Sequence, residues 1–214
     1  MEIDELPLVG GHPALDLVNT LERGAPAAGG GPADHLAGPS DLLRWARRAG
    51  LVDDAEARVV ADGWERDPGS GHAALAAVQD VREALYVALL AAMGVGPAGD
   101  RADAALERLH GRWAAATARS RLALDPEGAA AARLTVGTEP ASLIADRVAV
   151  GAVELLGDAD RARLRRCPPD AGGCGWVFLD RSRNGSRRWC RMADCGTTVK
   201  ARRLTERRRA ARAR

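Results

Sequence analysis

The sequence of 214 residues is poor in aromatic side chains, with five Trp, one Tyr and one Phe. Alanine and glycine are abundant, so a core must be packed mainly by Leu, Val and Ala, which favours helices that approach one another closely. No stretch of about 20 apolar residues occurs, which excludes a membrane-spanning helix. The N-terminal residues are acidic and lack the basic start and apolar stretch of a secretory signal, so we expect a cytoplasmic protein.

Catalytic motifs are missing as well. The sequence has no glycine-rich phosphate-binding loop and no nucleophile elbow. Its histidines are scattered without the spacing of metal ligands, at His12, His35, His72 and His110. His12 precedes Pro13, so we expect it to cap a helix or to lie at the surface. We therefore expect that the chain is not an enzyme.

Charge is divided unevenly along the chain. Residues 1–160 carry 14 Arg and 25 acidic residues, a net charge of −11. Residues 161–214 carry 16 Arg, one Lys and four acidic residues, a net charge of +13. This asymmetry predicts an acidic body and a basic C-terminal module, with the boundary near Gly157-Asp158.

Apolar periodicity predicts that the acidic body is helical. The expected helices cover residues 15–23, 41–50, 54–64, 73–93, 100–117 and 140–156, with a small β-hairpin from residues 121–124 and 132–136. We expect Ser40 to cap the second of these helices. The run from Asp67 to Gly71 is expected to be a non-helical break between the third and the fourth of these helices. The predicted fold class is therefore mainly α, with a small β-hairpin in the helical N-terminal domain.

Arg82 is an exception within the apolar stripe of the fourth helix. It lies seven positions from both Leu75 and Leu89, so it is expected to be buried, and a buried guanidinium needs an anion. An internal salt bridge, for example to Asp16 or Glu22, is one explanation, and a side chain that reaches water is another. The alternative is a pocket for an anionic ligand, for which the candidate residues are Asp16, Asn19 and Arg82.

The cysteines all lie in the last 48 residues, at Cys167, Cys174, Cys190 and Cys195, with the spacing C-x6-C-x15-C-x4-C. Two close pairs separated by a longer loop are typical of a four-thiolate zinc site. Two disulfides or four unconnected thiols are the alternatives, but a reducing cytoplasm favours metal. Four thiolates would close the shell of one structural zinc ion and leave no position for water. Few apolar residues surround the cysteines, so zinc would supply folding free energy.

The residues around these cysteines resemble the CGNR zinc finger family. The resemblance rests on FLDRSRNGSRRWCRM at residues 178–192, followed by Cys195-Gly196. Upstream, LDLVNT at residues 15–20 resembles the start of the ABATE domain that usually precedes this finger. Together the two resemblances cover most of the chain. They imply a stress-induced transcription regulator, a role inferred for the family, whose finger is taken to bind DNA.

One departure from the family motif concerns the last cysteine. The family name stands for Cys-Gly-Asn-Arg, but the sequence here reads Cys195-Gly196-Thr197-Thr198. The metal ligand and the glycine are kept, while the Asn and the Arg are replaced. If that Arg contacts DNA in relatives, the contact is lost here or is taken over by basic residues that follow, namely Lys200, Arg202 and Arg203.

Basic residues of the module are the candidates for phosphate contacts. A helix capped by Thr197 or Thr198 is expected to extend this basic surface to about Ala211. The candidate nucleic-acid-binding residues are Arg183, Arg187, Arg188, Arg191, Lys200, Arg202, Arg203 and Arg207. Arginine can neutralise phosphates and can also make bidentate contacts with guanine.

The expected organisation is therefore an ABATE-like sensor or dimerisation domain at residues 1–157 and a CGNR-like zinc finger with a basic C-terminal helix at residues 161–214. The expected partner is double-stranded DNA, and a small-molecule effector and a second copy of the chain are further candidates. One alternative is an RNA- or ribosome-associated zinc-binding protein, although scarce aromatic residues argue against single-strand recognition. Another is a protein–protein adaptor whose basic module is autoinhibited by docking on the acidic body.

Overall fold

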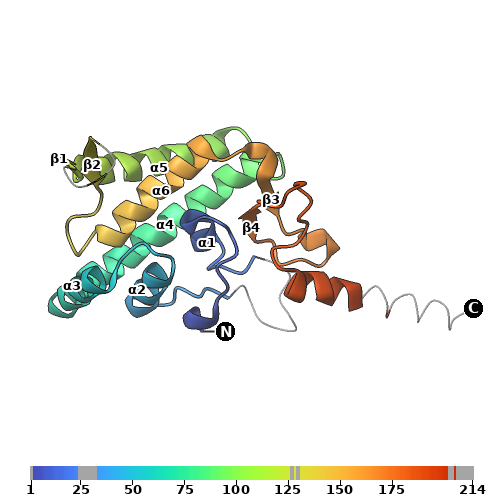
Figure 1. The fold of residues 1–214 in the computed structure, drawn as a ribbon, viewed down its shortest axis with the longest axis horizontal. Helices are drawn as coiled ribbons and strands as arrows, with labels where there is room; N and C mark the ends of the chain where they lie inside the picture. Colours follow the sequence, from blue (N-terminus) through green and yellow to red (C-terminus); the bar gives the residue numbers. More distant parts are fainter. Residues whose placement is uncertain (1, 24–32, 126–127, 129–130, 202–204, 206–214) are drawn as a thin grey trace, which may run out of the picture. The chain divides into compact units, whose positions relative to one another are not determined.

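The computed structural model describes residues 2–23, 33–125, 128, 131–201 and 205 (Figure 1). The chain forms two compact units. The helical unit comprises residues 1–6 and 35–161, and the cysteine unit comprises residues 7–34 and 162–214. The domain boundary expected near residues 157–161 stays a prediction; the compact units additionally place residues 7–34 with the C-terminal cysteines.

Long helices that pack side by side form the helical unit (Figure 1). Its elements are η1 (Ile3–Glu5), α2 (Pro39–Arg48), α3 (Asp54–Arg66), α4 (Pro68–Ala92), α5 (Asp100–Ala118) and α6 (Leu143–Asp158). Small side chains are buried along α4, α5 and α6, among them Ala84, Ala88, Ala105, Ala116, Ala149 and Ala152. The scarcity of aromatic residues had predicted such close helix packing, and the mainly helical fold confirms the expected fold class.

Helix starts follow local capping chemistry, with two corrections to the sequence-based expectation. The Asp53 carboxylate caps α3 by accepting from the N–H groups of Ala55 and Glu56, and the Glu56 carboxylate accepts from the Asp53 N–H, which completes a capping box. Ser40 does not cap α2, because that helix already begins at Pro39 and Gly38 is its N-cap residue. The expected break at residues 67–71 is also wrong beyond its first residue.

Residues 68–71 form the first turn of α4 rather than a break. Pro68 occupies the first helical position, where its missing N–H has no partner to lose. The Asp67 carboxylate accepts a hydrogen bond from the Gly69 N–H at 3.1 Å and so caps the helix. Sequence cues for a loop were thus cues for a helix start.

A small hairpin follows α5, as predicted. Strands β1 (Arg121–Leu124) and β2 (Ala132–Thr135) pair antiparallel, with Arg121 opposite Thr135 and Leu124 opposite Ala132. Every residue of both strands is exposed. Within the described part of the chain, no helix has both the length and the apolar character needed to cross a membrane.

A short N-terminal α-helix and a hairpin are elements of the cysteine unit. These are α1 (Pro13–Val18), β3 (Leu164–Arg166) and β4 (Val177–Leu179), and the strands pair antiparallel (Figure 1). The His12 side chain accepts a hydrogen bond from the Ala14 N–H at 3.1 Å, so the expected capping role of His12 is confirmed. The helix ends at Val18, five residues earlier than predicted, and Asn19 follows as its C-cap.

Asn19 joins the N-terminal segment to strand β4. Its side-chain amide donates to the Val177 carbonyl at 2.9 Å and accepts from the Val177 N–H at 2.9 Å. The Leu179 N–H donates to the Gly10 carbonyl at 2.8 Å. Backbone N–H and C=O groups on the edge of β4 that does not pair with β3 therefore find their hydrogen-bond partners in residues more than 150 positions earlier in the chain.

Replacing Asn19 by Ala should destabilise the cysteine unit. The Val177 N–H and carbonyl would lose their partners in a buried place, which we expect to cost about 3 kcal/mol. Chemical denaturation of the zinc-loaded protein, followed through tryptophan fluorescence, measures this loss. Asn184→Ala is the matched control, because Asn184 is exposed in the same unit. Equal effects of the two substitutions would contradict the role assigned to Asn19.

Candidate metal centre

The first pair of cysteines is presented by a tight turn between β3 and β4. Cys167 follows β3 directly and is buried. Its N–H donates to the Trp176 carbonyl at 2.8 Å, and its carbonyl accepts from the Gly175 N–H at 3.1 Å. A Cβ on Gly173 would lie 2.6 Å from the Cys167 Sγ, so only glycine lets the backbone pass this close to the sulfur. The turn returns the chain to place Cys174 beside Cys167.

The second pair of cysteines comes from a bend and a short π-helix, η4 (Met192–Gly196). Cys190 is buried before the bend, and Cys195 lies within η4. The Thr197 hydroxyl donates to the Met192 carbonyl at 3.0 Å and closes this turn. Thr197, which stands where the family motif has Asn, therefore has a local structural role in the second arm.

The sulfur atoms of these two arms converge. One Sγ from each of Cys167, Cys174, Cys190 and Cys195 forms a group whose members lie within 4.8 Å of one another. The Sγ atoms of Cys174 and Cys190 are 3.3 Å apart, and those of Cys190 and Cys195 are 3.7 Å apart. Tetrahedral zinc with Zn–S bonds of about 2.3 Å requires sulfur–sulfur distances of about 3.8 Å. The donor set and its spacing thus fit one structural zinc ion.

The thiols influence one another strongly in this cluster. Hydrogen bonds from Cys174 and then Cys190 lower the pKa of the Cys167 thiol to about 2, against the opposing effect of burial. Interaction with Cys167 raises the pKa of Cys174 and the pKa of Cys190. The cluster therefore stabilises the thiolate of Cys167, and this negative charge makes ionisation of Cys174 and Cys190 less favourable. Four thiolates this close together need a cation, and soft sulfur ligands select zinc over the harder divalent ions.

A buried carboxylate organises the loop between the two arms. Asp180 is fully buried and accepts hydrogen bonds from the Ser182 hydroxyl at 2.5 Å, the Ser182 N–H at 2.9 Å and the Arg187 N–H at 2.8 Å. The bond from the Ser182 hydroxyl, followed by the backbone bonds, lowers the pKa of Asp180 despite burial. The carboxylate stays charged and fixes the turn that leads to Arg187.

Arg187 is part of the frame of the cysteine unit. Its guanidinium donates to the Trp189 carbonyl at 3.1 Å, to the Val9 carbonyl at 3.1 Å and to the Cys190 carbonyl. It also lies 4.2 Å from the centre of the Phe178 ring, within the range of a cation–π contact. These contacts hold the backbone at the second zinc arm.

The other candidate nucleic-acid-binding residues differ from Arg187 in exposure. Arg183, Arg188, Arg191 and Lys200 are exposed. Arg191 makes a surface ion pair with Asp194 at 3.4 Å, and Arg188 lies 5.3 Å from the Trp189 ring centre. Residues 197–201 are helical, which agrees with the expected start of a helix there. Arg202, Arg203 and Arg207 lie outside the described residues, and the nucleic-acid role of the whole set stays a prediction.

The candidate ligand residues Asp16, Asn19 and Arg82 belong to two different units. In the cysteine unit, the Asp16 carboxylate accepts a hydrogen bond from the Gly10 N–H at 2.7 Å, and Asn19 is bonded to Val177. In the helical unit, Arg82 is buried as expected, and its Nε donates to Glu83 at 3.1 Å. Glu83 is therefore one partner for the salt-bridge explanation, and the suggested pairing of Arg82 with Asp16 or Glu22 stays a prediction. The ligand-binding role of the three residues stays a prediction.

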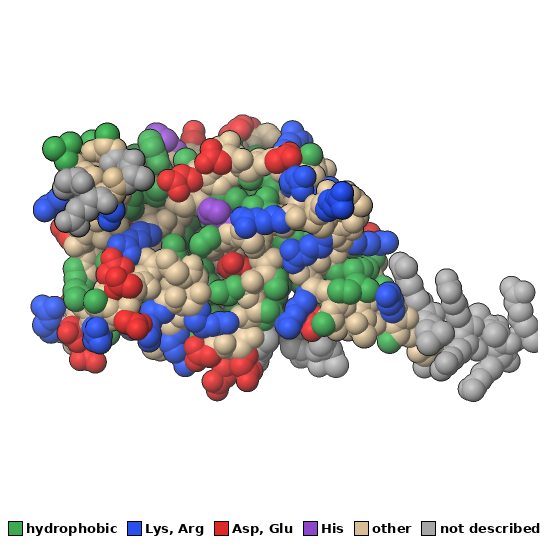
Figure 2. Space-filling view, viewed as in Figure 1, with side chains coloured by type: hydrophobic (Ala, Val, Ile, Leu, Met, Phe, Trp, Pro, Cys, Tyr) green, Lys and Arg blue, Asp and Glu red, His purple; other side chains and the backbone are tan. Residues whose placement is uncertain are grey.

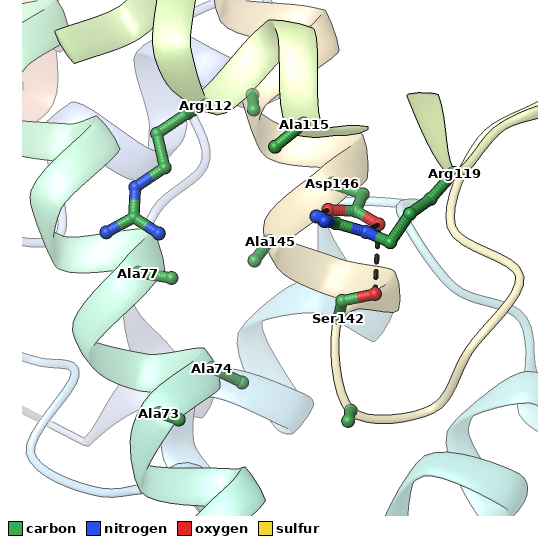
Figure 3. A pocket seen from close by; sticks show the side chains of 11 residues that line it. Ala73, Ala74, Ala77, Arg112, Ala115, Arg119, Ser142, Ala145 and Asp146 are labelled. Carbon is green, nitrogen blue, oxygen red and sulfur yellow. Dashed lines mark hydrogen bonds and ion pairs between the residues drawn. The ribbon is translucent and has the colours of Figure 1, made fainter. Parts of the chain in front are cut away.

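A pocket that sequence reasoning missed lies in the helical unit (Figure 3). It has a volume of about 250 Å³ and is lined by alanines of α4, α5 and α6, with Arg112, Arg119, Ser142 and Asp146. Figure 3 shows Ala73, Ala74 and Ala77 on one wall and Ala145 on the wall opposite. Small residues at helical spacing were the available signal for this pocket, because side chains of that size leave space between packed helices.

Polar groups of this pocket are connected at one end. Asp146 is buried and accepts from Arg119, with an ion-pair distance of 2.5 Å, and from the Ser142 hydroxyl at 2.9 Å. The hydrogen bond to Asp146 raises the pKa of Arg119, so this side chain stays cationic. On the other side, Arg112 pairs with Asp80 at 3.0 Å. The pocket therefore combines apolar walls with two arginines.

Comparison with protein families gives two matches, in the order expected from the sequence. Residues 11–159 match the ABATE family, described as “Putative stress-induced transcription regulator”. Residues 163–208 match the CGNR zinc finger. A comparison with curated proteins gave no match. The second match and the four converging thiols together make zinc the cofactor of the cysteine unit.

Replacing Cys190 by Ser should remove the bound zinc and unfold the cysteine unit, because the remaining three thiols cannot close the tetrahedral shell. The helical unit should keep its helix content. Zinc content by elemental analysis and circular dichroism measure the two effects. Ser186→Ala, a change at an exposed site in the same unit, is the control. Full zinc occupancy in the Cys190→Ser variant would disprove the four-thiolate site.

Proposed function

We propose, from the premise that this chain belongs to the ABATE family and carries a CGNR zinc finger, that it is a zinc-dependent transcription regulator that binds double-stranded DNA. In this proposal the cysteine unit contacts the DNA. The helical unit senses a small effector. Zinc has a structural role, because four thiolates leave no coordination position for a reacting water.

The observation that supports DNA binding most directly is the charge carried on the zinc-stabilised unit. Residues 161–214 have a net charge of +13, whereas residues 1–160 have a net charge of −11. Lys and Arg side chains recur on the face of Figure 2 where Figure 1 places β3 and β4. A rigid, strongly basic module is suited to the regularly spaced phosphates of a duplex.

Exposed arginines and a lysine are the residues expected to meet phosphate oxygens. Arg183 and Lys200 are exposed, so neither has to leave a buried place before it binds. Arg187 has a different role in the proposal, since its guanidinium is bonded to three backbone carbonyls. We therefore expect Arg187 to act on DNA binding through the shape of the loop.

The double variant Arg183→Ala, Lys200→Ala should bind duplex DNA more weakly and with a lower salt dependence. Each lost phosphate contact should reduce the slope of log affinity against log salt by about 0.9. Fluorescence anisotropy over a salt series measures this slope. The matched control is Arg58→Ala, Arg101→Ala, which removes the same charge from exposed sites of the helical unit.

An unchanged slope in the Arg183→Ala, Lys200→Ala variant would contradict the assignment of these two residues. Preference for single-stranded RNA over duplex DNA would instead favour an RNA- or ribosome-associated protein. Binding that survives nuclease treatment and requires an acidic protein would favour the adaptor.

The sensing role is assigned to the alanine-lined pocket of the helical unit. Its apolar walls suit a small organic body. Arg112 and Arg119 pair with Asp80 and Asp146, and the remaining N–H groups of the two guanidiniums can donate to an acidic group on that body. A volume of about 250 Å³ limits the effector to a small molecule. Dimerisation is the alternative role for this unit, and exposed Leu122, Leu124 and Leu134 of the β1–β2 hairpin offer an apolar surface for it.

Filling the pocket should abolish the response to an effector. We expect Ala77→Leu to remove the rise in melting temperature that a panel of small carboxylic acids produces in the parent protein. Saturation at about 100 times Kd would stabilise the parent by about 2.7 kcal/mol. Ala76→Leu is the matched control, because the neighbouring Ala76 is exposed on the same helix and does not line the pocket. An equal response of the two variants would exclude this pocket as the site.

A further inference from the structure

A second pocket lies in the cysteine unit beside the zinc ligands. It has a volume of about 330 Å³, and four arginines line it together with Gly185 and Ser186. These arginines are Arg165, Arg166, Arg187 and Arg188. Its lining contains no acidic residue, so positive charge is concentrated there without a counter-charge in the pocket itself.

Arg166 provides the most informative atom of this pocket. Its Nε is buried and has no hydrogen-bond partner among the described residues. A buried donor without an acceptor is unfavourable, and it is rarer still when the donor belongs to a charged group. Since Arg166 directly precedes the zinc ligand Cys167, its backbone position is fixed by the metal centre. Arg166 also lines the pocket, so an anion there would lie beside a guanidinium whose Nε has no acceptor among the described residues.

The other arginines are held in place before any ligand arrives. Arg165 donates to the Ala162 carbonyl at 2.5 Å and to the Leu164 carbonyl at 3.0 Å. Arg188 lies over the Trp189 ring. The two hydrogen bonds of Arg165 reduce the side-chain freedom that this residue would lose on binding, which favours affinity for a ligand of matching shape.

The carboxylate of Asp180 does not neutralise the pocket. Asp180 is close enough to Arg165 for the arginine to contribute to lowering the pKa of Asp180. Its two oxygens, however, already accept from Ser182 and from the Arg187 N–H. Arg166 and Arg188 remain as cations that line the pocket without an acidic neighbour in its walls.

Oxyanions with several acceptor oxygens match this arrangement. A phosphate group presents acceptors in several directions and can receive hydrogen bonds from two or three guanidinium groups at once. A carboxylate offers fewer directions, and a metal cation would be repelled. The pocket is also open to solvent on one side in the way that a phosphate within a longer chain requires, since Arg188 and Ser186 at its edge are exposed.

We propose that Arg165, Arg166 and Arg188 form a phosphate-binding site next to the zinc centre, with Arg187 as the residue that positions them. The assignment of this phosphate to a DNA backbone rests on the function proposed above; the site itself rests on the pocket and its arginines. Arg165 and Arg166 were not among the residues expected from the sequence to bind nucleic acid.

Titration of the zinc-loaded full-length protein with inorganic phosphate tests the site directly. The Nε–Hε resonance of Arg166, identified by its loss in Arg166→Gln, should shift in a saturable way in nitrogen–proton NMR spectra. Chloride at equal ionic strength should not reproduce the shift. Arg188→Gln should weaken phosphate binding by about tenfold, the effect of losing one charged hydrogen-bond donor. Arg101→Gln, at an exposed arginine of the helical unit outside the pocket, should leave it unchanged.

Duplex DNA provides the second arm of the experiment. Arg188→Gln and Arg166→Gln should each lower the slope of log affinity against log salt by about 0.9. Zinc content is measured for both variants. If Arg166→Gln fails to retain zinc, the test rests on Arg188→Gln, because Arg188 is exposed and its replacement should leave the fold intact.

The outcomes separate the two proposals. A phosphate-induced shift without DNA binding by the parent protein would support the site and overturn DNA as its source of phosphate. DNA binding by the parent with unchanged slopes in the variants, and no shift of Arg166 with phosphate, would overturn the site and leave the proposed function standing. Absence of both responses in the parent would overturn both.

Discussion

The structure of the cysteine unit depends on the neutralisation of four sulfur atoms that lie within 4.8 Å of one another. Few large apolar side chains are buried among residues 161–201, namely Leu164, Trp176, Val177, Phe178 and Val199, so burial alone contributes little to holding the two arms together. Zinc binding can contribute about 10–16 kcal/mol in comparable small sites. The turn at Asp180 and the course of the chain through Arg187 connect the two arms, so both depend on this closure.

A second constraint comes from the opposite end of the chain. Asn19 and Gly10 complete the hydrogen bonds of β4, whose other edge pairs with β3. The zinc turn is therefore supported by both its own hairpin and the N-terminal segment. Cysteine spacing predicted the metal ligands because the ligand pattern is local. It could not predict Asn19, because no sequence rule links a helix C-cap to a strand 158 positions later.

Local rules were similarly successful in the helical unit, and they failed where one residue type has two uses. The helices expected at residues 54–64 and 73–93 correspond to α3 and α4. Pro68 and Gly69 are typical of a loop, but proline also fits the first turn of a helix when a residue such as Asp67 caps it. The alanine-lined pocket could not be predicted in the same way. Alanine is compatible both with a close helix contact and with a space between helices, and only the packing of α4, α5 and α6 decides between the two.

The arginines of the cysteine unit show why net charge is a weaker guide to function than position. Arg187 is bonded to backbone carbonyls, the Nε of Arg166 is buried beside a zinc ligand, and Arg183 is exposed. All three add one charge to the same sum, yet Arg187 could meet an anion only by giving up its bonds to backbone carbonyls, whereas exposed Arg183 needs no such change. The same reasoning applies to the replaced family motif. Thr197 keeps a structural bond to Met192, so the loss of the family's Asn and Arg removes one cation and leaves the second zinc arm closed.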